Sequence, residues 1–176
     1  MATNVMFDLE TLSTDYNAAI IQIGACKFDT ENGNILDKFL VNVSMRDTTA
    51  KGFHVDSDTI QWWNNQNPEV LKMCMVDPVL LEEALEEFSK WYGNESMMTW
   101  CNGANFDFPI LTTSYKYFKM KTPWKYWHVS DYRTVVNLSG ITKEELDLKR
   151  EELGATYHNA LDDSIFQTKM LVEMLK

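Results

Sequence analysis

Phe7-Asp8-Leu9-Glu10-Thr11 lies near the amino terminus and continues the short apolar run Val5-Met6-Phe7, a pattern that predicts the start of a buried strand. Side chains alternate along a strand, so we expect Asp8 and Glu10 on the same face. Two neighbouring carboxylates repel each other and are costly to bury. A hard divalent cation, which prefers carboxylate and water oxygens, would stabilise them there. The alternative is an exposed strand end that carries two unrelated acids.

The composition indicates one globular domain over residues 1–176. The chain is 45% hydrophobic and 24% charged, and its length suits a single packed domain. It has neither a run of the ~18 apolar residues that span a membrane nor a secretion signal at its start, so we expect a cytoplasmic protein with no membrane partner. Its three cysteines are widely spaced, which argues against a disulfide framework or a zinc site.

The net charge of −10 argues against a general duplex-coating protein, because binding of that kind rests on a basic face. It leaves room for an enzyme that grips a short nucleic-acid end through metal ions, since bound cations reverse the local electrostatics of acidic side chains. The charge therefore favours a metal-dependent site over a basic groove.

Hydrophobic periodicity and turn signals predict an α/β domain. We expect strands at residues 5–10, 18–28, 35–43, 97–101 and 127–130. The first three form an antiparallel meander, because a turn with an Asn-Gly step joins the second to the third. We expect helices at residues 59–63, from 68, and at 77–93, 106–119, 131–138, 142–153 and 160–176, with a polar connector at 44–57. Ser57 or Asp58 caps the first helix, and Asp77-Pro78 begins the third.

Three separated motifs carry a resemblance to a known family. They are Asp8-Leu9-Glu10 on the first strand, Asn105-Phe106-Asp107 where a strand turns into a helix, and the segment His158–Asp163 before the last helix. Their order and separations resemble the motifs of DEDDh-type 3′→5′ exonucleases, especially phage exodeoxyribonuclease A-like and mycobacterial exoribonuclease-like members. Those members also tend to carry segments like Thr59–Trp63 (TIQWW) and Asp131–Thr134 (DYRT). The resemblance covers the whole domain and implies a ribonuclease H-like fold, with a mixed central sheet flanked by helices.

The chemistry of phosphodiester cleavage suits the residues of these motifs. Two metal ions about 3.5–4 Å apart can stabilise the attacking and leaving oxygens together, and holding them takes several carboxylates. The motifs offer four: Asp8, Glu10, Asp107 and Asp163. We expect these four to bind two Mg²⁺ or Mn²⁺ ions, with Asp8 between the ions. His158, with an unperturbed pKa of about 6.5, is the expected general base for the attacking water.

Asp162 competes with Asp163 for the ligand role. Asn159 at the N-cap places Asp162 at the third helical position, where an acid interacts favourably with the helix dipole. The family spacing from His158 selects Asp163. His54 and His128 have no companion at metal-ligand spacing, so we expect both to be structural.

Residues beside these motifs are expected to contact substrate. Trp62 and Trp63 cannot both face inward on one helix, so one ring is available to stack on a base; the alternative is packing beneath the connector. By resemblance, the other expected substrate contacts lie next to the metal-binding acids: Thr11, Leu12, Asn105 and Phe106.

Residues 115–127 (YKYFKMKTPWKYW) interleave lysines with aromatic residues in an otherwise acidic chain. This segment is either a track for phosphates or an amphipathic helix end with a solvated lysine face.

The leading prediction is a metal-dependent 3′–5′ exonuclease domain that acts on single-stranded 3′ ends, with DNA favoured, and releases nucleoside 5′-monophosphates. If the chain is phage-encoded, the site of action is the host cytoplasm. The alternatives are an exoribonuclease, a catalytically silent nucleic-acid-binding module of the same fold, and an acidic protein-interaction domain. A homo-oligomer is compatible with the sequence, which carries no signal for or against one.

Overall fold

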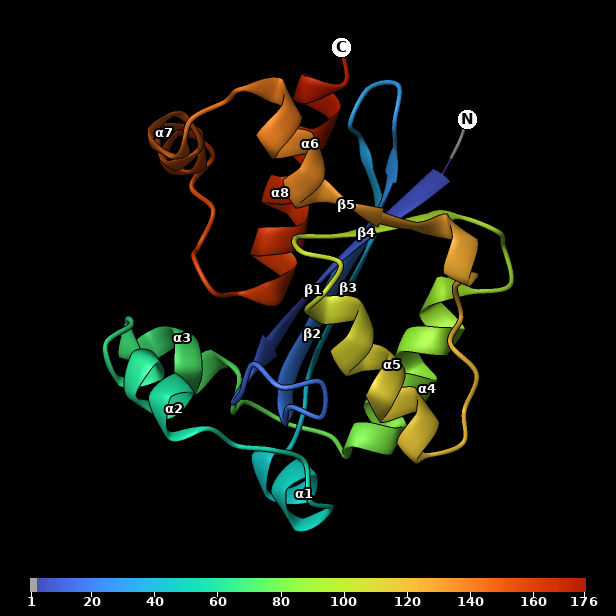
Figure 1. The fold of residues 1–176 in the computed structure, drawn as a ribbon, viewed down its shortest axis with the longest axis vertical. Coiled ribbons are helices and arrows are strands. Elements are labelled where there is room, and N and C mark those ends of the chain that lie inside the picture. The colour runs from blue at the N-terminus through green and yellow to red at the C-terminus, as the bar shows by residue number, and fades with distance from the viewer. Residues whose placement is uncertain (1–2) are drawn as a thin grey trace.

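The computed structural model describes residues 3–176 (Figure 1). The strands are β1 (Thr3–Thr11), β2 (Ile20–Asp29), β3 (Ile35–Asn42), β4 (Met98–Cys101) and β5 (Val129–Asp131). The helices are α1 (Met45–Ala50), α2 (Ser57–Asn64), α3 (Pro68–Met73), α4 (Leu81–Tyr92), α5 (Asp107–Tyr117), α6 (Tyr132–Ser139), α7 (Lys143–Leu153) and α8 (Ala160–Met174). A short 3-10 helix, η1 (Tyr126–His128), precedes β5.

The strands form one mixed sheet in the order β3-β2-β1-β4-β5. The first three strands pair antiparallel, as the predicted meander requires, and β4 pairs parallel with β1 and with β5. In Figure 1, α4 and α5 lie on one side of the sheet, and α6 and α8 on the other. This arrangement confirms the predicted α/β class with a mixed central sheet flanked by helices.

The two faces of β1 pack into different cores because its side chains alternate. Val5 and Phe7 belong to a cluster that includes side chains of α4 and α5. Met6 belongs to a second cluster with side chains of α6 and α8. Asp8 and Glu10 continue the face of Met6, so both acids point toward α8. The prediction that they share a face is correct.

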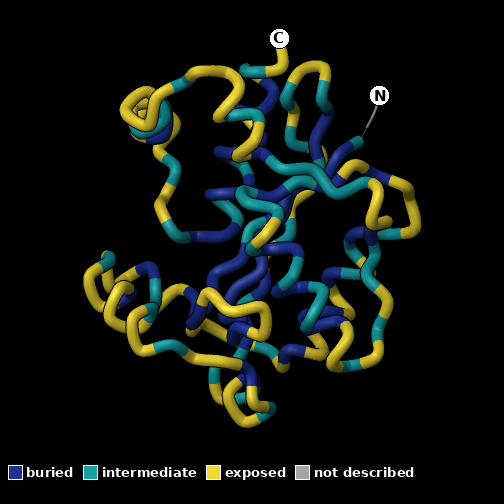
Figure 2. The backbone as a smooth tube through the Cα atoms, in the orientation of Figure 1, coloured by how far each residue is buried: buried dark blue, intermediate teal, exposed yellow. Residues whose placement is uncertain are grey.

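Burial follows the central strands, whereas the outer turns of the peripheral helices are exposed (Figure 2). In β2 every residue except Lys27 is buried, as expected for a strand covered on both faces. Among the described residues, we find no helix with the length and apolar character needed to span a bilayer.

The structure corrects four local predictions. The connector predicted at 44–57 contains a helix, α1, whose N-cap Ser44 accepts a hydrogen bond from the amide of Asp47. Helix α2 is capped by Asp56, not by Ser57 or Asp58, and the Asp56 side chain accepts from the amide of Thr59.

The other two corrections concern α4 and β5. Helix α4 begins at Leu81 and not at Asp77-Pro78. Val79 is held extended because its amide donates to Asn42 O (3.0 Å) and its carbonyl accepts from the amide of Ser44 (2.9 Å). The last strand begins at Val129, two residues later than predicted, because residues 126–128 form η1.

Candidate active site

The two acids of β1 lie opposite two residues of β2 that contact the start of α8. Asp8 pairs with Gly24 and Glu10 with Gln22 in the antiparallel register. A Cβ atom at Gly24 would lie 2.1 Å from the carbonyl carbon of Ala160, so the start of α8 rests directly on the backbone there. The Gln22 side chain accepts a hydrogen bond from the Ala160 amide (2.9 Å). These two contacts place the first turn of α8 over the carboxylates of β1.

The first turn of α8 presents Asp163 to the site. Asn159 caps the helix by accepting from the amide of Asp162 (3.1 Å), as predicted. Asp163 is buried and accepts from the amide of His158 (3.0 Å). Asp162 instead accepts from the amide of Thr156 (3.2 Å), outside the acid cluster. Asp163 therefore lies in the acid cluster and Asp162 does not, and the ligand role of Asp163 stays a prediction.

Asp107 joins the cluster from the first turn of α5. Its side chain is 2% exposed and its Oδ1 accepts a hydrogen bond from the amide of Leu9 (3.2 Å). The pairing of β1 with β4 ends at Met6, which leaves the later amides on that edge of β1 free to take another partner. This bond ties Asp107 to the strand segment between Asp8 and Glu10.

Burial raises the pKa of all four carboxyl groups. Burial, followed by the charges of Asp163 and Asp107, raises the pKa of Asp8 and of Glu10 well above the ordinary values. Burial raises the pKa of Asp107 to about 7. Burial also raises the pKa of Asp163, against the opposing effect of the Arg150 guanidinium. Four acids held in this way need a positive charge to remain ionised together at neutral pH.

Glu10 supplies a direct sign that a cation belongs here. Its side chain is 6% exposed, and no residue in 3–176 forms a hydrogen bond with its Oε1 atom. An unpartnered buried carboxylate oxygen is costly unless a cation completes its environment. The donor set of carboxylate oxygens also suits Mg²⁺ or Mn²⁺ better than a thiolate-seeking metal. The residues present therefore fit a hard divalent ion.

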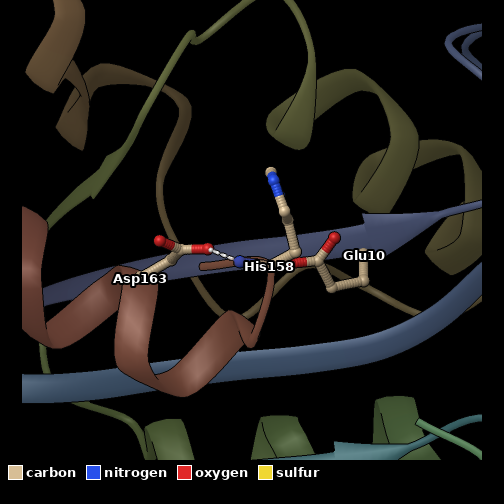
Figure 3. Close-up of side chains that lie close together, drawn as sticks. All are labelled: Glu10, His158 and Asp163. Carbon is tan, nitrogen blue, oxygen red and sulfur yellow. Dashed lines mark hydrogen bonds between the residues drawn. The ribbon is translucent and has the colours of Figure 1, made fainter. Parts of the chain in front are cut away.

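His158 stands at the edge of the acid cluster. Ligand atoms of Glu10, His158 and Asp163 lie within 4.8 Å of one another. In Figure 3 the imidazole rises from the chain between the two carboxylates, while the His158 amide carries the bond to Asp163. The backbone of His158 is left-handed (φ 61°), a strained conformation that is common at functional sites. Burial lowers the pKa of His158, so the ring is neutral at neutral pH and able to accept a proton.

The residues of this cleft that were not predicted include Arg150, Gln167 and Arg133. Arg150 forms an ion pair with Asp163 (2.5 Å), and its guanidinium lies between the rings of Tyr157 (4.3 Å) and Phe166 (4.1 Å). Gln167 donates to Asp8 Oδ1 (2.9 Å). Gln167 follows Asp163 by one helical turn, a spacing that signals a shared face; Arg150 sits in a run of charged helix residues with no comparable signal.

Arg133, the third, lines the cleft of about 470 Å³ that contains all four acids and His158. It is held by the carbonyl of Asn102 (3.0 Å). It belongs to the segment Asp131–Thr134 that was noticed for its resemblance, although no role was predicted for it.

A second cavity of about 540 Å³ adjoins the first and shares Leu9, Glu10, Trp62 and Phe106 with it. Its remaining lining includes Thr11 and Trp63. Four of the six predicted substrate contacts therefore line a cavity at the acids.

The other two lie elsewhere. Leu12 is 4% exposed and packs in the core, and Asn105 is exposed at the turn before α5. Neither lines these two cavities, and a substrate contact from either stays a prediction.

The two tryptophans divide as their spacing predicts. Trp63 is 2% exposed and its indole donates to the carbonyl of Thr11 (2.9 Å). Trp62 is 41% exposed and its ring lies edge-on to His158, with centroids 4.7 Å apart. His54 and His128 lie outside both cavities and bond to Ser13 and Ser96 respectively.

The fold and the site together define a DEDDh-type 3′–5′ exonuclease domain with a ribonuclease H-like fold. The chain belongs to the family described as the 3′-5′ exoribonuclease Rv2179c-like domain, whose sequence model matches residues 3–175. The resemblance that the three motifs suggested is thereby confirmed.

Individual relatives agree with this assignment. The chain is 26% identical to an exodeoxyribonuclease of Enterobacteria phage T4 over 156 residues, which cover 81% of this chain and 61% of the phage protein. Among solved structures, product-bound exonuclease I matches with a TM-score of 0.70 at 13% identity, over 100% of this chain and 43% of that one. The nuclease domain of 3′hExo, a DEDDh family member bound to rAMP, matches with a TM-score of 0.63 at 15% identity, over 98% and 91%. At these identities the structural matches show the fold.

Proposed function

We propose that this chain is a Mg²⁺- or Mn²⁺-dependent exonuclease that removes nucleotides from single-stranded 3′ ends, with DNA favoured, and releases nucleoside 5′-monophosphates. The observation that carries the proposal is the convergence of four buried or half-buried carboxylates, from β1, α5 and α8, beside a strained histidine. A structural single-ion site would not need that many acids, whereas a two-metal phosphodiesterase site does.

The proposed roles follow from the contacts of each side chain. The four residues that would hold the ions are Asp8, Glu10, Asp107 and Asp163. Bound divalent ions would polarise the phosphate and stabilise charge on the attacking and leaving oxygens. His158 would accept the proton of the attacking water, because its ring faces the cleft and its lowered pKa keeps it neutral.

Two further side chains would position the metal-binding acids. Gln167 orients Asp8 through its amide nitrogen. Arg150 holds Asp163 and is stacked on Tyr157, next to His158 in the chain. Arg150 therefore links the ligand on α8 to the loop that carries the proposed base.

The adjoining cavity suits a terminal nucleotide. Its apolar and aromatic lining residues are Leu9, Trp62, Trp63 and Phe106, and Glu10 also lines it. An exposed ring such as Trp62 gives a base a surface on which to stack, an interaction worth about 1–3 kcal/mol.

The sugar of the substrate separates two candidate functions. The phage relative is an exodeoxyribonuclease, which supports DNA, and the chain spans 61% of that relative's length. The family description names an exoribonuclease, which supports RNA as the second candidate.

The test is digestion of matched 5′-labelled single-stranded DNA and RNA oligonucleotides with Mg²⁺ or Mn²⁺. Asp8→Ala and a chelator are the controls. We expect a ladder that shortens from the 3′ end, faster on DNA, and absent in both controls. A faster ladder on RNA would select the second candidate. No shortening of either strand would refute the proposal and favour a silent binding module.

A further inference from the structure

The segment between Asp107 and Asp131 has a charge pattern unlike the rest of this acidic chain. It contains no aspartate or glutamate, in a chain with 26 of them, and it carries four lysines: Lys116, Lys119, Lys121 and Lys125. All four side chains are exposed, and within residues 3–176 none of them forms an ion pair. The positive charge of this segment is therefore open to a partner.

A groove runs along α5, and Lys116 is the one of these four lysines that lines it. It has a volume of about 400 Å³, and its lining includes Ala104, Pro109, Thr112 and Lys116. Ala104 of this lining precedes Phe106 by two residues in the chain, and Phe106 lines both cavities of the active site. Helix α5 runs beside the groove, with Asp107 at its first turn and Lys116 at its last.

The length of α5 suits several nucleotides. Its 11 residues span about 16 Å at ~1.5 Å per residue. At the ~3.4 Å rise of stacked bases, that distance corresponds to about five nucleotides. A strand whose 3′ end lies at the acids would thus run past Lys116.

Exposed aromatic rings flank the groove. Tyr126 is 83% exposed and Tyr16 is 66% exposed, and both line it. Next to Tyr126, Trp127 is 59% exposed, their ring centroids lie 4.8 Å apart, and the Lys125 ammonium lies 5.4 Å from the Trp127 ring centre. Alternating lysines and exposed rings are the features with which proteins bind single strands without sequence preference.

We propose that the α5 track, defined as Tyr16, Lys116, Lys125 and Tyr126, binds the part of the single strand that lies 5′ of the terminal nucleotide. This inference rests on the proposed function, and it adds a binding surface for the nucleotides that precede the terminal one. The occupant is a polyanion, because Lys116, Lys125 and Tyr126 lie in the one long acid-free stretch of a chain with a net charge of −10. Tyr115 and Trp124, which lie next to Lys116 and Lys125 in the chain, are buried and belong to the core.

The test compares a long and a short probe on the same protein. Fluorescence anisotropy with Ca²⁺ measures the affinity for two probes, a dinucleotide and a single strand of about 16 nucleotides, which is the upper end of known single-strand site sizes. A gel checks that both probes stay intact. In Lys116→Gln/Lys125→Gln the ratio of long-probe to short-probe affinity should fall about tenfold. The log–log salt slope should decrease in magnitude by about 1.4, or ~0.7 for each lost phosphate contact.

Two further variants complete the test. Tyr126→Ala keeps every charge and should lower the same ratio by at least about fivefold, through lost stacking. Lys143→Gln/Lys169→Gln removes two exposed lysines from α7 and α8 on the other side of the sheet and should leave the ratio unchanged.

The outcomes separate this proposal from the proposed function. An unchanged ratio in both track variants, or an equal fall in the α7/α8 control, would overturn the track. Tighter binding of an acidic peptide than of the long strand would assign the track to a protein partner instead. Failure of the native chain to degrade any strand with Mg²⁺ would refute the proposed function, while the binding ratio would still report on the track.

Discussion

Gly24→Ala tests how the sheet positions the active-site helix. Gly24 lies on β2 opposite Asp8, and the start of α8 rests on it. The new Cβ would lie 2.1 Å from the carbonyl carbon of Ala160 and 2.2 Å from the amide nitrogen of Leu161. Both atoms are backbone, so no side-chain rotation can relieve the contact.

The size of the effect follows from this distance. Cβ contacts below 3.0 Å are essentially never seen, so the first turn of α8 must move by about 1 Å, taking His158 and Asp163 with it. A displacement of about 1 Å at a catalytic group can lower turnover by about 100-fold. Overpacking costs about 1–3 kcal/mol, and the reduced backbone freedom of alanine offsets about 0.5–1 kcal/mol of it. We expect a net loss of roughly 0.5–2 kcal/mol in the free energy of unfolding.

The assay measures kcat at saturating metal beside the free energy of unfolding in urea. Gly140→Ala is the matched control, because its Cβ meets nothing within 4 Å and its left-handed backbone (φ 77°) makes the change cost a comparable ~1–2 kcal/mol. Both variants should lose stability, and only Gly24→Ala should lose turnover. A folded Gly24→Ala protein with native kcat would refute the claim that this close approach positions the site.

The remaining predictions concern the acids, the base and the tryptophans. Asp107→Asn keeps an acceptor for the Leu9 amide but removes a charge, so metal-dependent hydrolysis should fall by at least about 100-fold, and near-native turnover would exclude Asp107 as a ligand. Burial raises the pKa of Asp107 from 3.8 to about 7, so between these pH values the folded chain holds a proton that the unfolded chain releases. In the presence of a chelator, the free energy of unfolding should therefore fall as the pH rises from 3.8 to about 7. Urea titrations that show a rise in the free energy of unfolding would contradict this sign. His158→Gln should lower kcat by about 10²–10⁴-fold without weakening Mn²⁺ binding, and a calorimetric loss of binding would make His158 a ligand instead. Trp62→Ala should raise KM by about 5- to 100-fold with little change in the free energy of unfolding. Trp63→Phe should instead lower the free energy of unfolding by about 1–3 kcal/mol, because the Thr11 carbonyl loses its donor. The reverse pattern would exchange the roles of the two tryptophans.

The features that were predictable from the sequence depend on local rules. Asp8 and Glu10 share a face because strand side chains alternate, and that rule needs no tertiary information. Asp163 enters the site because the cap at Asn159 sets where α8 begins. The mixed sheet follows from hairpin signals early in the chain and strand–helix steps later.

The features that were missed depend on contacts between distant segments. Asp77-Pro78 has the composition of a helix start, but the backbone bonds of Val79 to Asn42 and Ser44 keep the chain extended for three more residues. Arg150 looks like one of several charged residues on a solvated helix, and it is buried only because Tyr157 and Phe166 stack on it in the folded chain. Local sequence predicts neither the backbone bonds of Val79 nor the stacking of rings on Arg150.

Calorimetric titration with Mn²⁺, in the presence of the nucleoside 5′-monophosphate product, tests most directly whether the carboxylates of β1, α5 and α8 form a divalent-metal site. The native chain should bind two ions, and Asp163→Asn should lose at least one of them while keeping its fold. Absence of Mn²⁺ binding by the native chain, or unchanged binding by Asp163→Asn, would contradict this account of the site.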